Sequence, residues 1–303
     1  MDHQKSTRRK GTQRAKSKKS NTSQTPISSV RTNNDTSWTN IAEWYEILQG
    51  ENGSDYHQEV ILPGIQRLLT SRQETINGMN IIDLACGQGV VSRYLAQKGA
   101  IVTGVDLAGN LLDYARKYIS EEGSPKYLQA DLTQLIHEDE LSIEVEPESF
   151  DAATLVLAVQ NMTPLSPVWQ GVNKLLKPGG MFIIVMMHPC FRIPQHSDWQ
   201  LVKEANRQER RVWLYKSSKA IDILAHPGQQ ASGQGSEQSK HFHRPLQAYI
   251  NTLGSAGLWI DHIEEWNSHK KEQPGLWQEV KDQARKEIPL FLALRARKMV
   301  LPL

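Results

Sequence analysis

The chain has 303 residues, a formal net charge of +2 and 39% hydrophobic residues, and this length suits one α/β domain with insertions. Two cysteines, Cys86 and Cys190, are too few for a disulfide framework, and no apolar run is long enough to span a membrane. We therefore expect a cytoplasmic protein with no membrane segment.

The first 36 residues differ in composition from the rest of the chain. Residues 1–20 hold eight lysines and arginines against one acid, Asp2, and Ser, Thr, Asn and Gln dominate residues 20–36. Such a segment has little to bury, so we expect a disordered basic tail over 1–36. It is either a solvated tail without a partner, an arm for RNA, DNA or anionic lipid, or a transit peptide.

Two helices are expected over residues 37–77. Apolar residues from Trp38 to Leu48, including Tyr45, recur at helical spacing. The stretch Asp55-Tyr56-His57-Gln58 can cap a second helix, whose apolar face runs from Val60 to Leu69. Plain packing against a sheet explains these helices as well as contact with a ligand does.

The central motif is Asn80–Val90, with the sequence NIIDLACGQGV. A short apolar run typical of a buried strand ends at Asp83 and leads into Gly87 and Gly89. Residues from Val90 onward have helical spacing. Glycine allows positive φ and lets a ligand approach the backbone closely, so this strand, turn and helix indicate a nucleotide-type site.

Further strands are expected after this motif, and several end in polar residues. The second is expected at 100–106, ending at Asp106, and the third at 126–131, ending at Asp131. The fourth covers 151–159 and the fifth 181–187, with Leu176-Lys177-Pro178-Gly179-Gly180 before it. Two more strands are expected at 258–266 and 289–297, after a polar insertion at 189–243 that we interpret as a lid over the site.

These motifs, in this order, resemble the class I S-adenosylmethionine-dependent methyltransferases. The matching residues are Asp83–Gly89, Val105-Asp106, Ala130-Asp131, Phe150-Asp151 and Leu176–Gly180. The resemblance implies an α/β, doubly wound, seven-stranded mixed sheet of order 3-2-1-4-5-7-6 with its last strand antiparallel. The methyltransferase domain would cover 37–303. An NAD-type Rossmann domain is disfavoured, because Ser92 stands where that fingerprint has its third glycine.

The resemblance also implies the contacts to S-adenosylmethionine. Asp106 would bind the ribose hydroxyls, Asp131 the adenine amino group and Asp83 the methionine ammonium, while the backbone at Gly87 and Gly89 packs against the cofactor. Four apolar positions complete the predicted cofactor site: Ala85, Leu107, Leu132 and Leu157.

Acceptor-side candidates follow the fourth and fifth strands. His188 is the first polar residue past the fifth strand, and its ordinary pKa suits a general base; a structural histidine is the alternative. We expect His188 and Gln160 to line one cavity, because strand ends carry ligands in open α/β sheets. Arg192 would bind a substrate carboxylate or pair with the lid, and Tyr45 would touch substrate.

Three functions are compatible with these residues. The favoured one is methyl transfer to an oxygen or nitrogen of a small-molecule substrate. The second is an RNA-modifying methyltransferase or RNA-binding protein, with nucleic acid contacted through the tail only. The third is a binding protein that keeps the cofactor fold without catalysis. No metal is expected, since His188, Cys190, His241 and His243 lack a close ligand pair. The sequence leaves the oligomeric state open.

Overall fold

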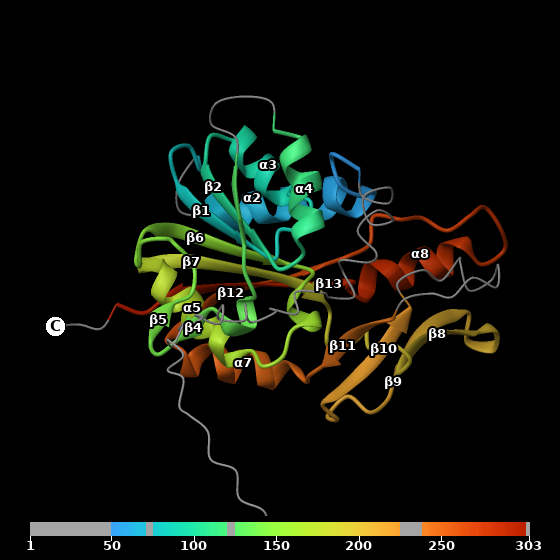
Figure 1. The fold of residues 1–303 in the computed structure, drawn as a ribbon. Coiled ribbons are helices and arrows are strands. Elements are labelled where there is room, and N and C mark those ends of the chain that lie inside the picture. Colours follow the sequence, from blue (N-terminus) through green and yellow to red (C-terminus); the bar gives the residue numbers. More distant parts are fainter. Residues whose placement is uncertain (1–49, 71–74, 120–124, 225–237, 301–303) are drawn as a thin grey trace, which may run out of the picture. The chain divides into compact units, whose positions relative to one another are not determined.

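The computed structural model describes residues 50–70, 75–119, 125–224 and 238–300, all within the unit Asn34–Leu303 (Figure 1). The predicted tail at 1–36 and the expected helix around Tyr45 lie outside the described residues. Within the described ranges, no helix combines the length and the apolar character needed to cross a bilayer.

Seven strands form one sheet in the order β12-β13-β7-β6-β1-β2-β3. In chain order they are β1 (Asn80–Leu84), β2 (Ile101–Asp106), β3 (Lys126–Gln129), β6 (Phe150–Val156), β7 (Leu176–Met187), β12 (Leu258–Trp266) and β13 (Phe291–Lys298). Strand β13 is antiparallel to both β7 and β12, whereas the neighbours from β7 to β3 run parallel. The predicted order 3-2-1-4-5-7-6, with the last strand antiparallel, is confirmed.

Helices cover both faces of this sheet. Its central strands are buried on both faces, as in other parallel sheets. One face packs on π-helix η1 (His57–Ile61), α2 (Leu62–Thr70) and α3 (Val90–Gln97); the other packs on α5 (Ser166–Leu175) and α7 (Leu246–Ser255). Figure 1 shows these two groups on opposite sides of the strands. The alternating side chains of β1 illustrate the division, since Ile81 joins the first core and Ile82 the second.

Two further helices complete the main elements. Helix α4 (Gly109–Lys117) follows β2, and α8 (Gln278–Glu287) precedes β13. Short 3-10 turns occur at η2 (Leu132–Gln134), η3 (Val159–Asn161) and η4 (Lys203–Ala205).

The polar insertion contains strands that the sequence did not predict. Two antiparallel pairs form there: β8 (Ser197–Val202) with β9 (Arg207–Val212), and β10 (Lys219–Leu224) with β11 (Gln238–His243). A smaller pair, β4 (Ile136–His137) with β5 (Glu140–Leu141), lies in the acidic stretch after β3. These strands are short and composed mostly of polar residues, so they lack the apolar alternation by which a strand is recognised in a sequence.

The largest differences from the expected boundaries are in β6 and β7. Strand β6 ends at Val156 rather than at residue 159, because Leu157 has a φ of +54° and leaves the extended conformation. Strand β7 begins at Leu176, so the predicted turn Leu176–Gly180 belongs to the strand; the register of its pairing with β6 shifts between Phe150 and Ala152.

Candidate functional site

The turn from β1 into α3 forms one wall of the site. Gly87 and Gly89 have φ values of +54° and +81°, in the region that favours glycine. A Cβ atom on Gly89 would lie 2.2 Å from the Oη atom of Tyr127, so packing alone requires this glycine. Gly87 lines two adjoining cavities at this edge of the sheet, whereas Gly89 is not among the lining residues of either.

Asp106 closes β2, and the backbone holds its carboxylate on both sides. Oδ2 accepts a hydrogen bond from the Gly87 N–H at 2.8 Å, and Oδ1 accepts one from the Ala108 N–H at 2.8 Å. Burial raises the pKa of this carboxyl, and the backbone N–H groups oppose that rise. Each oxygen keeps a second lone pair for a ligand hydroxyl.

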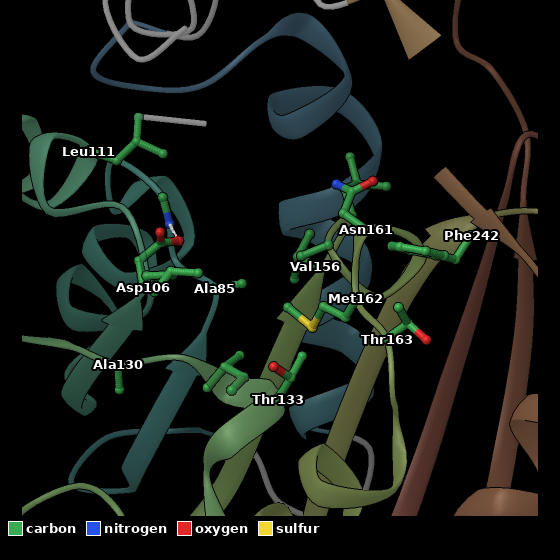
Figure 2. A pocket seen from close by; sticks show the side chains of 15 residues that line it. Ala85, Asp106, Leu111, Ala130, Thr133, Val156, Asn161, Met162, Thr163 and Phe242 are labelled. Atoms are coloured by element: carbon green, nitrogen blue, oxygen red, sulfur yellow. Dashed lines mark hydrogen bonds between the residues drawn. The ribbon is translucent and has the colours of Figure 1, made fainter. Parts of the chain in front are cut away.

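These groups border a cavity of about 350 Å³ at the carboxyl ends of β1, β2 and β6 (Figure 2). Figure 2 shows Asp106 and Leu111 on one side and Asn161, Met162, Thr163 and Phe242 on the other. Most of the lining is apolar. The complete lining consists of Ala85, Gly87, Asp106, Leu107, Leu111, Ala130, Leu132, Thr133, Val156, Leu157, Ala158, Asn161, Met162, Thr163 and Phe242.

Two residues in this lining have strained backbones. Ala85 and Leu157 have φ values of +53° and +54° although neither is glycine. Such a conformation costs roughly 1–3 kcal/mol and persists where surrounding contacts impose it. The Leu157 N–H donates to the Val185 carbonyl at 2.7 Å, which anchors the end of β6 to β7. The strain at both positions coincides with the cavity wall, as is common at binding sites.

Asp131 lies beside the cavity without lining it. Its Oδ1 accepts hydrogen bonds from the backbone N–H and the hydroxyl of Thr133, at 2.8 Å and 2.7 Å, so it caps η2. Its neighbours Ala130, Leu132 and Thr133 form the wall instead. The contact of Asp131 with an adenine amino group therefore stays a prediction. It requires Thr133 to release Oδ1, or a carboxylate oxygen of Asp131 to accept a hydrogen bond from the amino group in addition to its present one.

A smaller cavity adjoins the first and shares Ala85, Gly87 and Val156 with it. Asp83 lines this second cavity and is 1% exposed. Its carboxylate accepts hydrogen bonds from the hydroxyls of Ser92 at 2.6 Å and Thr154 at 2.7 Å. Burial raises the pKa of Asp83 to about 6, against the opposing effect of these hydroxyls. The other lining residues are His57, Cys86, Gln88, Val90 and Val91.

His188 is buried and both of its ring nitrogens are engaged. Nδ1 accepts a hydrogen bond from the Cys190 N–H at 3.2 Å, which leaves the proton on Nε2 to donate to Glu265 Oε1 at 2.8 Å. Burial lowers the pKa of His188, and the bond to Glu265 opposes that change. His188 does not line either of the two cavities, in contrast to its expected place.

Gln160 does not line either cavity. Its amide turns back and donates from Nε2 to the Leu157 carbonyl at 2.8 Å, and the side chain is buried. The next residue, Asn161, lines the first cavity instead. The expectation of a wall shared by Gln160 and His188 is thus corrected: one residue of register in η3 decides which amide faces the cavity.

Arg192 fastens the loop after β7 to the segment before β13. Nε donates to the Pro289 carbonyl and Nη2 to the Ile288 carbonyl, each at 3.1 Å. The guanidinium lies over the Trp199 ring at 5.1 Å, and burial lowers the pKa of Arg192 to about 10. It pairs with no carboxylate among the described residues and lines neither cavity, and Tyr45 lies outside the described residues.

Phe242, in the insertion at 189–243 that we interpreted as a lid, lines the first cavity and was not anticipated. It stands between His241 and His243 on β11, and both histidines are buried while Phe242 borders the first cavity. Arg244 donates from Nη2 to the Met162 carbonyl at 2.7 Å and joins β11 to the turn after η3. A single aromatic in a polar insertion gives no sequence signal for this role.

The described histidines of the insertion form no cluster that could hold a metal ion. His243 Nε2 lies 2.8 Å from the Tyr215 carbonyl, and Cys190 contacts the Tyr215 hydroxyl. Across the described ranges there is no cluster of three or more His, Cys, Asp or Glu that could hold a metal ion.

The family model and the curated relatives described here, to which this chain is similar, are methyltransferases. A family model described as a methyltransferase domain matches residues 82–184. The ubiquinone biosynthesis O-methyltransferase of Vibrio atlanticus (strain LGP32) is 30% identical over 151 residues, which cover 50% of this chain and 60% of that protein. The methyltransferase sll0829 of Synechocystis sp. (strain ATCC 27184 / PCC 6803 / Kazusa) is 36% identical over 113 residues, covering 37% and 48%. The chain spans about half the length of the curated relatives it matches.

Solved structures match over more of the chain. An S-adenosylmethionine-dependent methyltransferase from Mesorhizobium loti superposes with a TM-score of 0.55 and 26% identity, covering 78% of this chain and 99% of that one. A similar protein from Listeria monocytogenes superposes with a TM-score of 0.56 and 24% identity, and it covers the same shares of the two chains. This similarity shows the shared fold.

Proposed function

Because the chain carries a methyltransferase domain of the class I, S-adenosylmethionine-dependent family, we propose that it transfers a methyl group to an oxygen or nitrogen of a small-molecule acceptor. The cofactor of this family is S-adenosylmethionine, as expected from the sequence. It supplies an electrophilic methyl group on a sulfonium, and the protein has to hold the acceptor in line with that bond.

The observation that carries the proposal is the composition of the first cavity. It runs from the Asp106 carboxylate to Phe242 of the lid, and its wall between them is largely apolar. Two carboxylate oxygens with free lone pairs fit the vicinal hydroxyls of a ribose, and the apolar side chains fit a planar base. Phe242 closes the far side, which suits a small acceptor better than a polymer.

Different residues of the two cavities bind different parts of the methyl donor, S-adenosylmethionine. Asp106 binds the ribose hydroxyls, because its oxygens are already positioned by the N–H groups of Gly87 and Ala108. Leu107 and Leu132 flank the base, and Asp131 reaches its amino group when one of its carboxylate oxygens accepts that bond in addition to capping η2.

On the methionine side of the donor, Ala85, Gly87 and Leu157 bring backbone close to the sulfonium. Asp83, held by two hydroxyls, offers negative charge to the ammonium.

His188 is the base in the sequence-based hypothesis, and its geometry favours a positioning role. For Nδ1 to accept an acceptor's proton, the hydrogen bond from Cys190 would first have to break. The pair with Glu265 would then stabilise the imidazolium. Without that rearrangement, His188 fixes the turn after β7. Arg192 and Tyr45 stay predicted acceptor contacts, whereas Gln160 would become one only if its amide left the Leu157 carbonyl.

The test has two stages. The purified full chain and its Asp106→Asn variant are titrated with S-adenosylhomocysteine in a calorimeter. Asp113→Asn is the control for that variant, because the Asp113 carboxylate is exposed on α4. Radiolabelled methyl donor is then offered with a metabolite library and, separately, with total RNA. Label in a small molecule supports the proposal. Label in RNA alone would assign the second function, and binding without any transfer would assign the non-catalytic one.

A further inference from the structure

The second cavity contains polar groups that the proposed cofactor contacts do not use. His57 and Gln88 both line it, and they are 7% and 1% exposed. Because buried polar groups in proteins are nearly always hydrogen-bonded, a buried group without a partner indicates a ligand or an ordered water. The cavity adjoins the first one at Ala85 and Gly87, on the side of the glycine turn.

Gln88 presents such a group. Its Nε2 donates to the Gly50 carbonyl at 2.5 Å, while its Oε1 is buried and has no hydrogen-bond partner among the described residues. Asp83 lies in the same wall with its two hydroxyl donors. An unpaired carbonyl oxygen and a carboxylate on residues that line the same cavity attract a cation with N–H donors, such as an ammonium.

His57 stands in the same wall, at the first residue of η1. Its Nδ1 lies 3.0 Å from the Ser54 hydroxyl, and its Nε2 has no hydrogen bond within the described part of the chain. Burial lowers the pKa of His57 to about 4, so the ring is neutral near pH 7. When the Ser54 hydroxyl donates to Nδ1, the proton of the neutral ring sits on Nε2, which is then a hydrogen-bond donor in a residue that lines the cavity.

We propose that His57, oriented by Ser54, donates its Nε2–H to the carboxylate of the methionine part of the donor. The inference rests on the proposed function for the identity of the cofactor. It assigns the ammonium to the side of Gln88 and Asp83, and the carboxylate to the side of His57. The two ends of one zwitterion thereby meet groups of opposite hydrogen-bonding character within a single small cavity.

The segment that carries His57 is attached to the glycine turn, which supports this placement. Arg93 Nη2 donates to the Glu51 carbonyl, and its Nη1 donates to the Gln88 carbonyl, each at 2.5 Å. A Cβ on Gly53 would lie 2.7 Å from Val90 Cγ1 and 2.8 Å from His57 Cβ, so the segment packs closely on the start of α3. The segment that carries His57 is thereby attached to the glycine turn at Gln88 and to the start of α3.

Three ligands separate the parts of the cofactor: S-adenosylhomocysteine, its decarboxylated analogue, and 5′-methylthioadenosine, which lacks both charged groups. Binding of each to the full wild-type chain is measured by calorimetry. We expect wild type to bind S-adenosylhomocysteine roughly tenfold or more tightly than the decarboxylated analogue, because a hydrogen bond to a charged group is lost. Failure of wild type to bind S-adenosylhomocysteine at all would count against the proposed function itself.

The variants then locate the effect. His57→Ala should weaken S-adenosylhomocysteine roughly tenfold and leave the other two ligands within about twofold. His57→Gln, which can place an amide N–H near the same point, should recover part of the loss, and Ser54→Ala should show a smaller loss of the same kind. His137→Ala, an exposed histidine on β4, is the matched control and should change nothing.

Two results would overturn the proposal. One is a His57→Ala variant that binds all three ligands as wild type does. The other is an equal weakening for all three, which would assign His57 to packing of the glycine turn. If His57→Ala fails to fold, as judged by thermal unfolding, the Ser54→Ala and His57→Gln variants and the wild-type ligand series decide the same question.

Discussion

Asp106→Asn is the sharpest perturbation of the cofactor site, because it replaces one carboxylate oxygen by an NH₂ group of nearly the same size. In the wild-type structure each carboxylate oxygen accepts a backbone N–H, from Gly87 and from Ala108, at 2.8 Å. In the variant the new NH₂ group must face one of those N–H groups, since both sides of the carboxylate are occupied by donors. One donor is left unpaired whichever way the amide is turned, either the buried N–H of Ala108 or the half-buried N–H of Gly87.

The magnitude follows from these contacts. An unpaired buried donor costs roughly 1–3 kcal/mol, so the free energy of unfolding should fall by about that amount. Loss of the carboxylate's charge-assisted bonds to the ribose hydroxyls should weaken binding by roughly 1.5–3 kcal/mol, or about 10- to 150-fold in Kd. Burial holds the pKa of Asp106 above its usual range, and the two backbone donors keep that rise limited.

Calorimetric titration with S-adenosylhomocysteine measures the second effect, and chemical unfolding measures the first. Asp113→Asn on α4 is the control, because its side chain is 71% exposed and pairs only with Arg116 among the described residues. A folded Asp106→Asn protein that binds S-adenosylhomocysteine within twofold of wild type would refute the assignment of the ribose to the end of β2.

The remaining predictions concern pH, the turn after β7 and the tail. Because burial raises the pKa of Asp83 to about 6, from 3.8, the folded state binds more protons between about pH 4 and 6. The free energy of unfolding should therefore lose roughly 3 kcal/mol as pH rises through that window and stay lower above it. Asp83→Asn should remove this dependence in urea titrations at pH 4.5 and 7.5; an unchanged pH profile would contradict the burial argument. His188→Gln should lower the unfolding midpoint by a few degrees while turnover falls less than tenfold, whereas a loss of a hundredfold or more with unchanged cofactor affinity would restore the general base. Removal of residues 1–36 should leave the melting temperature and cofactor affinity nearly unchanged, since that sequence offers little apolar surface to bury; a drop of many degrees would contradict this.

Local sequence patterns predicted the strands of the sheet and the position of its ligand edge, whereas the order of the strands was implied by the family resemblance. Apolar runs that end in Asp83 and Asp106, and the glycines between them, are short-range patterns that a strand and a turn impose on any chain. The structure confirms the sheet order and places Asp106 in the cavity wall. The predicted place of β13 between β7 and β12 came from the family resemblance, since nothing local in its sequence specifies a neighbour.

Only the tertiary structure decided which polar side chains face the cavity. Asn161 lines it and Gln160 does not, because the backbone leaves β6 at Leu157 with positive φ and reverses the alternation on which the prediction depended. His188 turns to Glu265, 77 residues away, and His57 reaches the glycine turn through contacts made by Gln88 and Arg93. Phe242 enters from a polar insertion whose strands have no periodic signal. The direction of a side chain at a strand end depends on partners distant in the chain, and a local pattern carries no information about them.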